Sequence, residues 1–212
     1  MSEQQVEQMV VPTDIMIDIE TVSTKTNALI VSIAAVTFNV YKHHQPIRQL
    51  ELLVDVSEYI DKKLNKIEQD TKEQVYDVDQ QTLNWWKTQH IQTIKRTFFD
   101  KPRVKIQEAC SLLNTFIHEQ KSIQRYWCQG MNFDPIVLDH TFQTCGINPK
   151  WKFWQWRDAR TVQNMIPKVQ LPSRAEEDKH SALDDCLYQI QVVCHVYNVF
   201  KIAHDKQHIH PV

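Results

Sequence analysis

The chain has 212 residues, 42% of them hydrophobic, which fits one domain that buries a core without disulfide or metal staples. Its 26 acidic and 24 basic residues leave a formal charge of −2, so no overall positive field attracts nucleic acid or an anionic membrane. The only two glycines, Gly130 and Gly146, exclude a Walker phosphate loop and a G-x-G-x-x-G nucleotide fingerprint.

The cysteines and the ends of the chain suggest its compartment and its boundaries. The five cysteines form no C-x-x-C pair, and their odd number argues against a disulfide framework or a zinc ribbon, so we expect buried thiols in a reducing cytoplasm. No basic and apolar leader begins the chain and no run of eighteen apolar residues occurs, so we expect a soluble protein without a membrane partner. We expect a flexible N-terminus over residues 1–12, a single domain over 13–204 and a tail over 205–212.

Residues 14–20, Asp-Ile-Met-Ile-Asp-Ile-Glu, predict a buried strand that carries carboxylates. Side chains alternate between the faces of a strand, so the three isoleucines share one face while Asp18 and Glu20 share the other, roughly 7 Å apart. Two ionised carboxylates on a half-buried strand repel each other and lose hydration unless a cation lies between them. Hard oxygen ligands suit Mg²⁺ or Mn²⁺. The alternative is a strand with one solvent-facing side, on which both acids are simply hydrated.

Two more strands are expected next. Residues 27–40 are rich in β-branched residues and almost continuously apolar, which is typical of a strand covered on both faces. After a turn at residues 43–46, residues 47–56 predict a third strand and complete an antiparallel meander. We interpret His43 and His44 as turn residues.

A helix with two adjacent tryptophans is predicted after a polar segment. Residues 57–74 are charged, which is typical of a solvated helix or loop. Asp79 is suited to cap a following helix that carries Trp85 and Trp86. Adjacent helical residues point about 100° apart, so we expect one indole in the core and the other half-covered or lining a groove.

The middle of the chain predicts a helix, a strand and another helix. Residues 95–105 are basic and favour a solvated face over a phosphate contact, and apolar residues at helical spacing follow Pro102. Residues 122–129 predict a short strand that ends at Gly130. Asp134, before a proline, is either the N-cap of the next helix or a functional carboxylate.

The last third is rich in helix. Residues 151–156 carry three tryptophans, a helix is predicted from residues 157–160, and residues 167–178 form a polar connector. Residues 181–200 predict a final helix with an apolar arc. Strands followed by helices, a strand and more helices predict an α/β fold, with a mixed β-sheet flanked by α-helices.

The final helix opens with His180-Ser-Ala-Leu-Asp-Asp185. Asp184 and Asp185 fall on opposite flanks of the apolar arc, so periodicity does not decide which one faces the sheet. Ser181 and Asp184 resemble a capping box, which would leave Asp185 to point elsewhere. His180 lies on the connector just before the helix.

Three ordered motifs resemble those of the DEDDh 3′→5′ exonucleases, which have a ribonuclease H-like fold. They are D-x-E at Asp18 and Glu20, G-x-N-F-D ending at Asp134, and H-x4-D from His180 to Asp185. The likeness covers about residues 14–200. The segment after the D-x-E, the Thr-Leu-x-Trp-Trp pair and the Trp-Arg-Asp-Ala-Arg-Thr segment resemble the phage exonuclease A proteins and related bacterial exoribonucleases. A phage-encoded member would act in the host cytoplasm.

The resemblance implies a set of functional residues. Asp18, Glu20, Asp134 and Asp185 would hold two Mg²⁺ or Mn²⁺ ions, and His180 would be the general base that accepts a proton from the attacking water. Ser181 stands where the tyrosine-type subgroup has its tyrosine, so the chain resembles the histidine type. The expected reaction releases nucleoside 5′-monophosphates from a 3′ end.

Substrate contacts are predicted less sharply. Thr21 and Val22 would lie near the terminal nucleotide by the family's geometry, and aromatic residues commonly stack on single-stranded bases. The expected substrate contacts are therefore Thr21, Val22, Trp86 and Trp127, with Trp85 as a further candidate. For Asp158 and Arg160, the sequence leaves open a structural ion pair or a substrate contact.

The sequence favours single-stranded DNA as the substrate, because the resemblance to phage exonuclease A is closest. An exoribonuclease that trims RNA 3′ ends is the nearest alternative, and nothing in the sequence predicts recognition of a 2′-hydroxyl. A non-catalytic module that uses the same fold to bind nucleic acid or protein is a third alternative. The sequence leaves a homodimer open.

Overall fold

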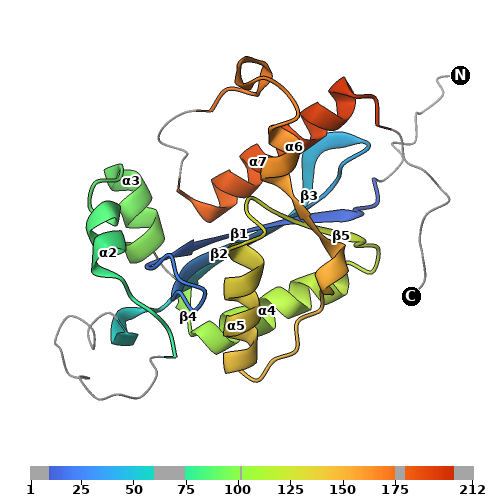
Figure 1. The fold of residues 1–212 in the computed structure, drawn as a ribbon. Coiled ribbons are helices and arrows are strands. Elements are labelled where there is room, and N and C mark those ends of the chain that lie inside the picture. The colour runs from blue at the N-terminus through green and yellow to red at the C-terminus, as the bar shows by residue number, and fades with distance from the viewer. Residues whose placement is uncertain (1–9, 60–74, 101, 175–179, 203–212) are drawn as a thin grey trace, which may run out of the picture.

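A computed structural model describes residues 10–59, 75–100, 102–174 and 180–202. These residues form a mixed six-stranded sheet in the order β4-β3-β2-β1-β5-β6 (Figure 1). The first three strands along the chain form an antiparallel meander, and β5 and β6 extend it in parallel with β1. The strands are β1 (Asp14–Thr21), β2 (Ile30–Asn39), β3 (His43–Val54), β4 (Arg103–Val104), β5 (Arg125–Cys128) and β6 (Trp156–Asp158).

Helices cover both faces of the sheet. In Figure 1, α4 and α5 lie on one face, α6 and α7 lie on the other, and α2 and α3 lie to one side. This is the mixed sheet flanked by helices that the sequence predicts. The α-helices are α2 (Gln80–Trp86), α3 (Ile91–Ile94), α4 (Ile106–Glu119), α5 (Asp134–Thr144), α6 (Ala159–Gln163) and α7 (Ala182–Val199), with a π-helix η1 (Lys95–Phe99) and short 3-10 helices η2 (Phe153–Gln155) and η3 (Lys168–Gln170).

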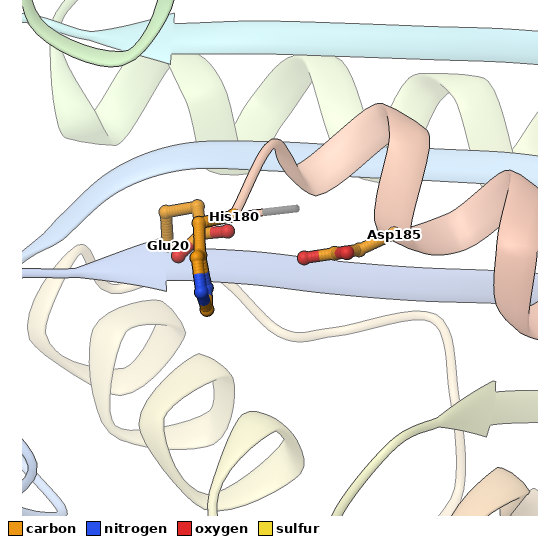
Figure 2. A group of neighbouring side chains, drawn as sticks. All are labelled: Glu20, His180 and Asp185. Atoms are coloured by element: carbon orange, nitrogen blue, oxygen red, sulfur yellow. The ribbon is translucent and has the colours of Figure 1, made fainter. Parts of the chain in front are cut away.

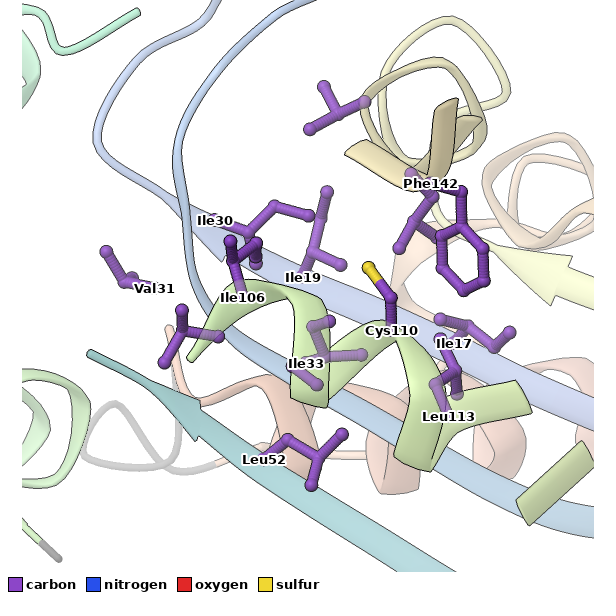
Figure 3. Close-up of a cluster of buried hydrophobic side chains, with 14 of the residues drawn as sticks. Ile17, Ile19, Ile30, Val31, Ile33, Leu52, Ile106, Cys110, Leu113 and Phe142 are labelled. Atoms are coloured by element: carbon purple, nitrogen blue, oxygen red, sulfur yellow. The ribbon is translucent and has the colours of Figure 1, made fainter. Parts of the chain in front are cut away.

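The two faces of β1 follow the predicted alternation. Ile17 and Ile19 belong to the core cluster beneath α4, where they pack with Cys110 and Leu113 (Figure 3). Met16, on the opposite face, belongs to a second cluster that includes residues of α7. Each fully buried aliphatic side chain contributes about 1.5–3 kcal/mol. The two clusters fix β1 in the middle of the sheet with its even-numbered residues toward α7.

Asp14 fastens the beginning of β1 to its neighbours. It is fully buried, and its carboxylate accepts bonds from Arg125 Nε at 2.6 Å, Trp127 Nε1 at 2.8 Å and the Val40 amide at 3.2 Å. Arg125 comes from β5, so this paired and hydrogen-bonded charge ties β1 to β5 at the amino end of both strands.

Some expected boundaries are corrected. Asp79 caps α2 as predicted, since its carboxylate accepts a bond from the Thr82 amide at 2.8 Å. His43 lies in β3 and pairs with Asn39, so the turn between β2 and β3 is earlier and shorter than expected. Most of the polar segment 57–74, residues 1–9 and the tail 205–212 lie outside the described residues.

Two further expectations concern the cysteines and membranes. All five cysteines are free thiols, four of them buried and Cys145 half-buried. Among the described helices, none is both long enough and apolar enough to cross a membrane.

Candidate active site

A cavity of about 900 Å³ opens at one edge of the sheet. The parallel strands β1, β5 and β6 all have their carboxyl ends at this edge, which is where open α/β sheets commonly bind ligands. The cavity wall combines the end of β1, the turn between β5 and α5, residues of α2 and α6, and the start of α7. Segments far apart in the sequence therefore meet in one space.

The D-x-E carboxylates lie in this cavity rather than in open solvent. Asp18 and Glu20 are only 8% and 9% exposed, so the interpretation as a hydrated strand face is wrong. Glu20, His180 and Asp185 each offer one ligand atom within 4.8 Å of the others. Figure 2 shows these three side chains projecting into the same space between the end of β1 and the start of α7.

Asp134 enters the cavity from the other side. Gly130, with a φ of 142° that strongly favours glycine, begins the turn from β5 into α5. Asp134 is 7% exposed and stands in the first turn of α5, with Phe133 in the cap position. The interpretation of Asp134 as the N-cap is therefore wrong, and its carboxylate contributes to the cavity wall instead.

The four carboxylates penalise one another's ionisation. Burial raises the pKa of Asp18 well above its ordinary value, and repulsion from its three carboxylate neighbours raises it further. Burial and repulsion by Asp185 and Asp134 likewise raise the pKa of Glu20. Burial raises the pKa of Asp134 to about 7, and burial also raises the pKa of Asp185. At neutral pH this cluster therefore favours the approach of positive charge.

Two polar side chains that the sequence did not single out support the cluster. Arg174, from the connector before α7, forms an ion pair with Asp185. Gln189 donates a hydrogen bond from Nε2 to Asp18 at 2.8 Å. A usable signal existed for Gln189, because it lies four residues after Asp185 and therefore on the same face of α7. Arg174 is separated from the motifs by a connector, so its partner could not be read from spacing.

The expected capping box is wrong. Ser181 occupies the N-cap position of α7, but its hydroxyl makes no cap bond and is buried without a hydrogen-bond partner among the described residues. Asp184 instead forms an ion pair with Arg96 at 2.5 Å, and Arg96 also pairs with Glu51 at 3.1 Å. The expectation that Asp185 is the acid left free for the site still holds, because Asp185 lines the cavity and Asp184 does not.

As expected, one tryptophan of the pair is buried and the other is partly exposed. The sequence favoured Trp86 as the substrate contact, but Trp86 is the buried one. Trp86 is 3% exposed, and its indole nitrogen donates to the Thr21 carbonyl at 2.9 Å, so it buttresses the end of β1. Trp85 is 42% exposed, lines the cavity and contacts the ring of His180. Both tryptophans border the cavity, and Trp85 is the more exposed of the two.

Two predicted substrate contacts are corrected. Trp127 is 1% exposed and bonded to Asp14 on the α7 face of the sheet, so it is not available to stack on a base. The Val22 side chain is fully buried in the core, and its amide and carbonyl bond to Leu29 and Asp79. Thr21 does line the cavity, where its hydroxyl donates to the Ser23 carbonyl at 2.6 Å.

Asp158 and Arg160 lie at the rim of the cavity. Asp158 caps α6, since its carboxylate accepts bonds from the Arg160 amide at 3.1 Å and the Thr161 hydroxyl at 2.7 Å. Arg160 donates to the Gln129 carbonyl at 2.9 Å and lowers the pKa of Asp134 against the effect of burial. Arg160 thus supports the turn that leads to Asp134, and Asp158 fixes the start of α6.

The donor set suits a hard divalent cation. Four carboxylates converge in the cavity, and the buried Oε1 of Gln189, also in the cavity wall, has no hydrogen-bond partner among the described residues. Such a group of oxygen ligands is what Mg²⁺ and Mn²⁺ prefer. A divalent cation would also relieve the repulsion that raises the carboxylate pKa values.

This sheet topology, with D-x-E on the central strand and the further acids and histidine around one cavity, defines a 3′→5′ exonuclease of the DEDDh type, a class that uses divalent metals. The chain belongs to the Rv2179c-like family of 3′-5′ exoribonuclease domains, whose family model matches residues 13–197. No curated protein sequence gives a significant match to the chain.

Two solved structures are similar to the chain. Exonuclease X in complex with 5′ overhanging duplex DNA aligns with a TM-score of 0.50 and 15% identity, over 90% of this chain and 94% of that one. The nuclease domain of 3′hExo, described as a DEDDh family member bound to rAMP, aligns with a TM-score of 0.49 and 11% identity, over 88% of this chain and 92% of that one. The likeness to exonuclease X supports the ribonuclease H-like fold expected from the sequence.

Proposed function

We propose that this protein hydrolyses single-stranded nucleic acid from its 3′ end and releases nucleoside 5′-monophosphates. The observation that carries the proposal is the convergence of Asp18, Glu20, Asp134 and Asp185 with His180 in one cavity. We assign the four acids to the binding of two divalent cations and His180 to general base catalysis. No catalytic position of the family's pattern is missing from this set.

In this proposal the side chains have separate catalytic and binding roles. Bound cations, held by the four carboxylates, would supply positive charge that stabilises the charge developing on the phosphate oxygens and lowers the pKa of the attacking water. His180 lies beside Glu20 and Asp185 and is placed to accept that water's proton. Gln189 orients Asp18 through its hydrogen bond, and Thr21 and Trp85 face the space that the terminal nucleotide would occupy.

RNA is the substrate that we propose first. The family is described as one of exoribonucleases, and this description outweighs the expectation of DNA drawn from the resemblance to phage exonuclease A. DNA remains the second candidate because of that resemblance. We propose Mg²⁺ as the working ion, with Mn²⁺ as a substitute, and a cytoplasmic location.

The test compares end-labelled single-stranded RNA, single-stranded DNA and blunt duplexes with Mg²⁺, with Mn²⁺ and with chelator. We expect release of 5′-monophosphates from RNA at a rate more than about tenfold above that from DNA, no release with chelator, and no release by Asp18→Asn. A preference for DNA of the same size would reverse the substrate assignment. Tight binding of all strands without metal-dependent release would instead support the non-catalytic binding module.

A further inference from the structure

An exposed aromatic pair lies on the short helix η2, outside the cavity. Phe153 is 82% exposed and Trp154 is 55% exposed, and the two rings contact each other with 5.0 Å between centroids. Single exposed apolar residues are common on proteins, whereas two adjacent exposed aromatic rings in edge-to-face contact form a candidate interaction surface.

Buried tryptophans before and after the pair keep the Phe153 and Trp154 rings at the surface. Trp151 and Trp156 are 4% and 6% exposed, pack against each other at 5.6 Å between ring centroids, and belong to the core cluster under the sheet. Trp151 also donates its indole N–H to Asp139 at 2.9 Å. With both flanking tryptophans anchored inside, the short turn between them leaves Phe153 and Trp154 facing solvent.

The turn that carries the pair is fixed by hydrogen bonds. Arg157 donates from Nη1 to the carbonyls of Trp154 and Trp156, both at 2.8 Å. The Lys152 amide donates to Gln155 Oε1 at 2.9 Å. A ring platform held in this way loses little conformational freedom when a planar ligand stacks on it.

The segment that carries the pair is positively charged. Residues 147–157 contain Lys150, Lys152 and Arg157 and no acidic residue, although the whole chain has a formal charge of −2. All three cations are exposed, and none of them takes part in an ion pair within the described parts of the chain. Exposed aromatic rings among cations are the combination with which proteins hold single-stranded nucleic acid.

The platform is connected to the active site by one strand. β6 leads from η2 to Asp158 at the rim of the cavity, and Trp154 lies four residues before Asp158. Two steps at about 2 Å in the 3-10 helix and two at about 3.3 Å in the strand give a span of roughly 11 Å. At about 3.4 Å per stacked nucleotide, roughly three nucleotides cover that distance.

We propose that Phe153 and Trp154, with Lys150, Lys152 and Arg157, form a second contact for single-stranded nucleic acid. The rings stack on unpaired bases a few nucleotides to the 5′ side of the 3′ end that the cavity holds, and the cations neutralise the phosphates between them. The inference rests on the proposed exonuclease function, and it predicts that long strands bind more tightly than short ones because of this surface.

The test measures binding to 5′-labelled RNA of about three and about twelve nucleotides by fluorescence anisotropy in the Asp18→Asn background. We expect the ratio of long-strand to short-strand affinity to fall about tenfold when Phe153→Ala and Trp154→Ala are combined. The matched control is Phe200→Ala, which removes another aromatic ring that is 52% exposed and should leave the ratio unchanged. Lys150→Gln with Lys152→Gln should reduce the salt dependence of long-strand binding.

An unchanged affinity ratio in the double aromatic variant would overturn the platform and leave the proposed function intact, provided that the parent protein still releases 5′-monophosphates. If the parent protein releases none, the proposed function itself fails. Light scattering measures the oligomeric state and so tests whether the surface instead binds a second copy of this chain. Loss of a dimer in the double variant, with long-strand affinity unchanged, would assign the surface to a second copy of this chain and reject the nucleic-acid contact.

Discussion

The indole ring of Trp85 meets the imidazole ring of His180 edge-on, with 4.8 Å between ring centroids and 84° between ring planes. His180 has a φ of 62°, in the left-handed region that costs a residue with a side chain about 1–2 kcal/mol. The contact joins α2 to the segment before α7, so it helps to hold the proposed general base in a conformation that its backbone disfavours.

Trp85→Ala should therefore lower kcat by about tenfold, equivalent to about 1.4 kcal/mol of transition-state stabilisation. Trp85→Phe keeps a ring against His180 and should recover most of the rate. Steady-state kinetics on a short single-stranded substrate checks both variants. A rise in KM with unchanged kcat would show that Trp85 contacts the substrate and does not position His180.

His180→Ala should reduce kcat by about 10²–10⁴-fold, because it removes the group that accepts the proton from the attacking water. Binding of Mg²⁺, measured by calorimetry, should persist because the four carboxylates remain. His195→Ala, which changes a half-buried histidine elsewhere on α7, is the matched control and should retain activity. Full activity of His180→Ala at every pH would contradict the general base assignment.

Asp14 and Asp18 lie on the same face of β1, yet their substitution should have opposite effects on stability. Asp14→Asn breaks a buried ion pair with Arg125, which costs about 3–5 kcal/mol and lowers Tm by roughly 10 °C in a chain of this size. Asp18→Asn removes a carboxyl whose ionisation is penalised by burial and by its acidic neighbours, and it keeps an oxygen for Gln189, so Tm measured with chelator at pH 7.5 should rise by roughly 3 °C. A fall in Tm for Asp18→Asn under these conditions would show that the carboxylate cluster does not strain the metal-free fold.

The pH dependence of stability depends in part on Asp134, because burial raises the pKa of this carboxyl from its ordinary 3.8 to about 7 in the folded protein. Between these two values the unfolded chain has lost the proton while the folded protein still holds it, so this residue's contribution to stability falls as the pH rises and is fully lost above pH 7. Asp134→Asn should therefore match the parent near pH 4 and exceed it in Tm at pH 7.5, both measured with chelator.

Added Mg²⁺ should reverse that difference. A ligand that binds only the folded state stabilises it, and the parent protein retains all four carboxylates for the cation while Asp134→Asn does not. The measurement is Tm at pH 7.5 with and without Mg²⁺. Equal stabilisation of both proteins by Mg²⁺ would remove Asp134 from the proposed metal ligands.

The local elements could be predicted because their signals are local. The alternation of β1, the apolar arc of α7 and the Asp79 cap each involve residues within a few positions of one another, and all three hold in the structure. The three acidic motifs were recognisable for a related reason, since each is short and contiguous. Their order along the chain was enough to indicate the family.

Contacts between distant segments were not predictable in the same way. Trp127 was expected to meet substrate, but it is committed to Asp14, 113 positions away. The capping box at Ser181 was a sound local pattern, but Asp184 instead finds Arg96, 88 positions away. In both cases the side chain pairs with a charged partner from a distant element, and the sequence does not show which elements will be neighbours.

The amino-acid order by itself determined the sheet-and-helix architecture, the acidic strand at its centre and the class of chemistry, because periodicity and short motifs depend only on neighbouring residues. Only the tertiary structure decided which side chains reach the cavity: it buried Trp86 and Trp127, exposed Trp85, and brought Arg174 and Gln189 to the carboxylates. The reason is that burial and pairing depend on packing across the whole sheet, where an aromatic or charged side chain takes the partner that the fold presents to it.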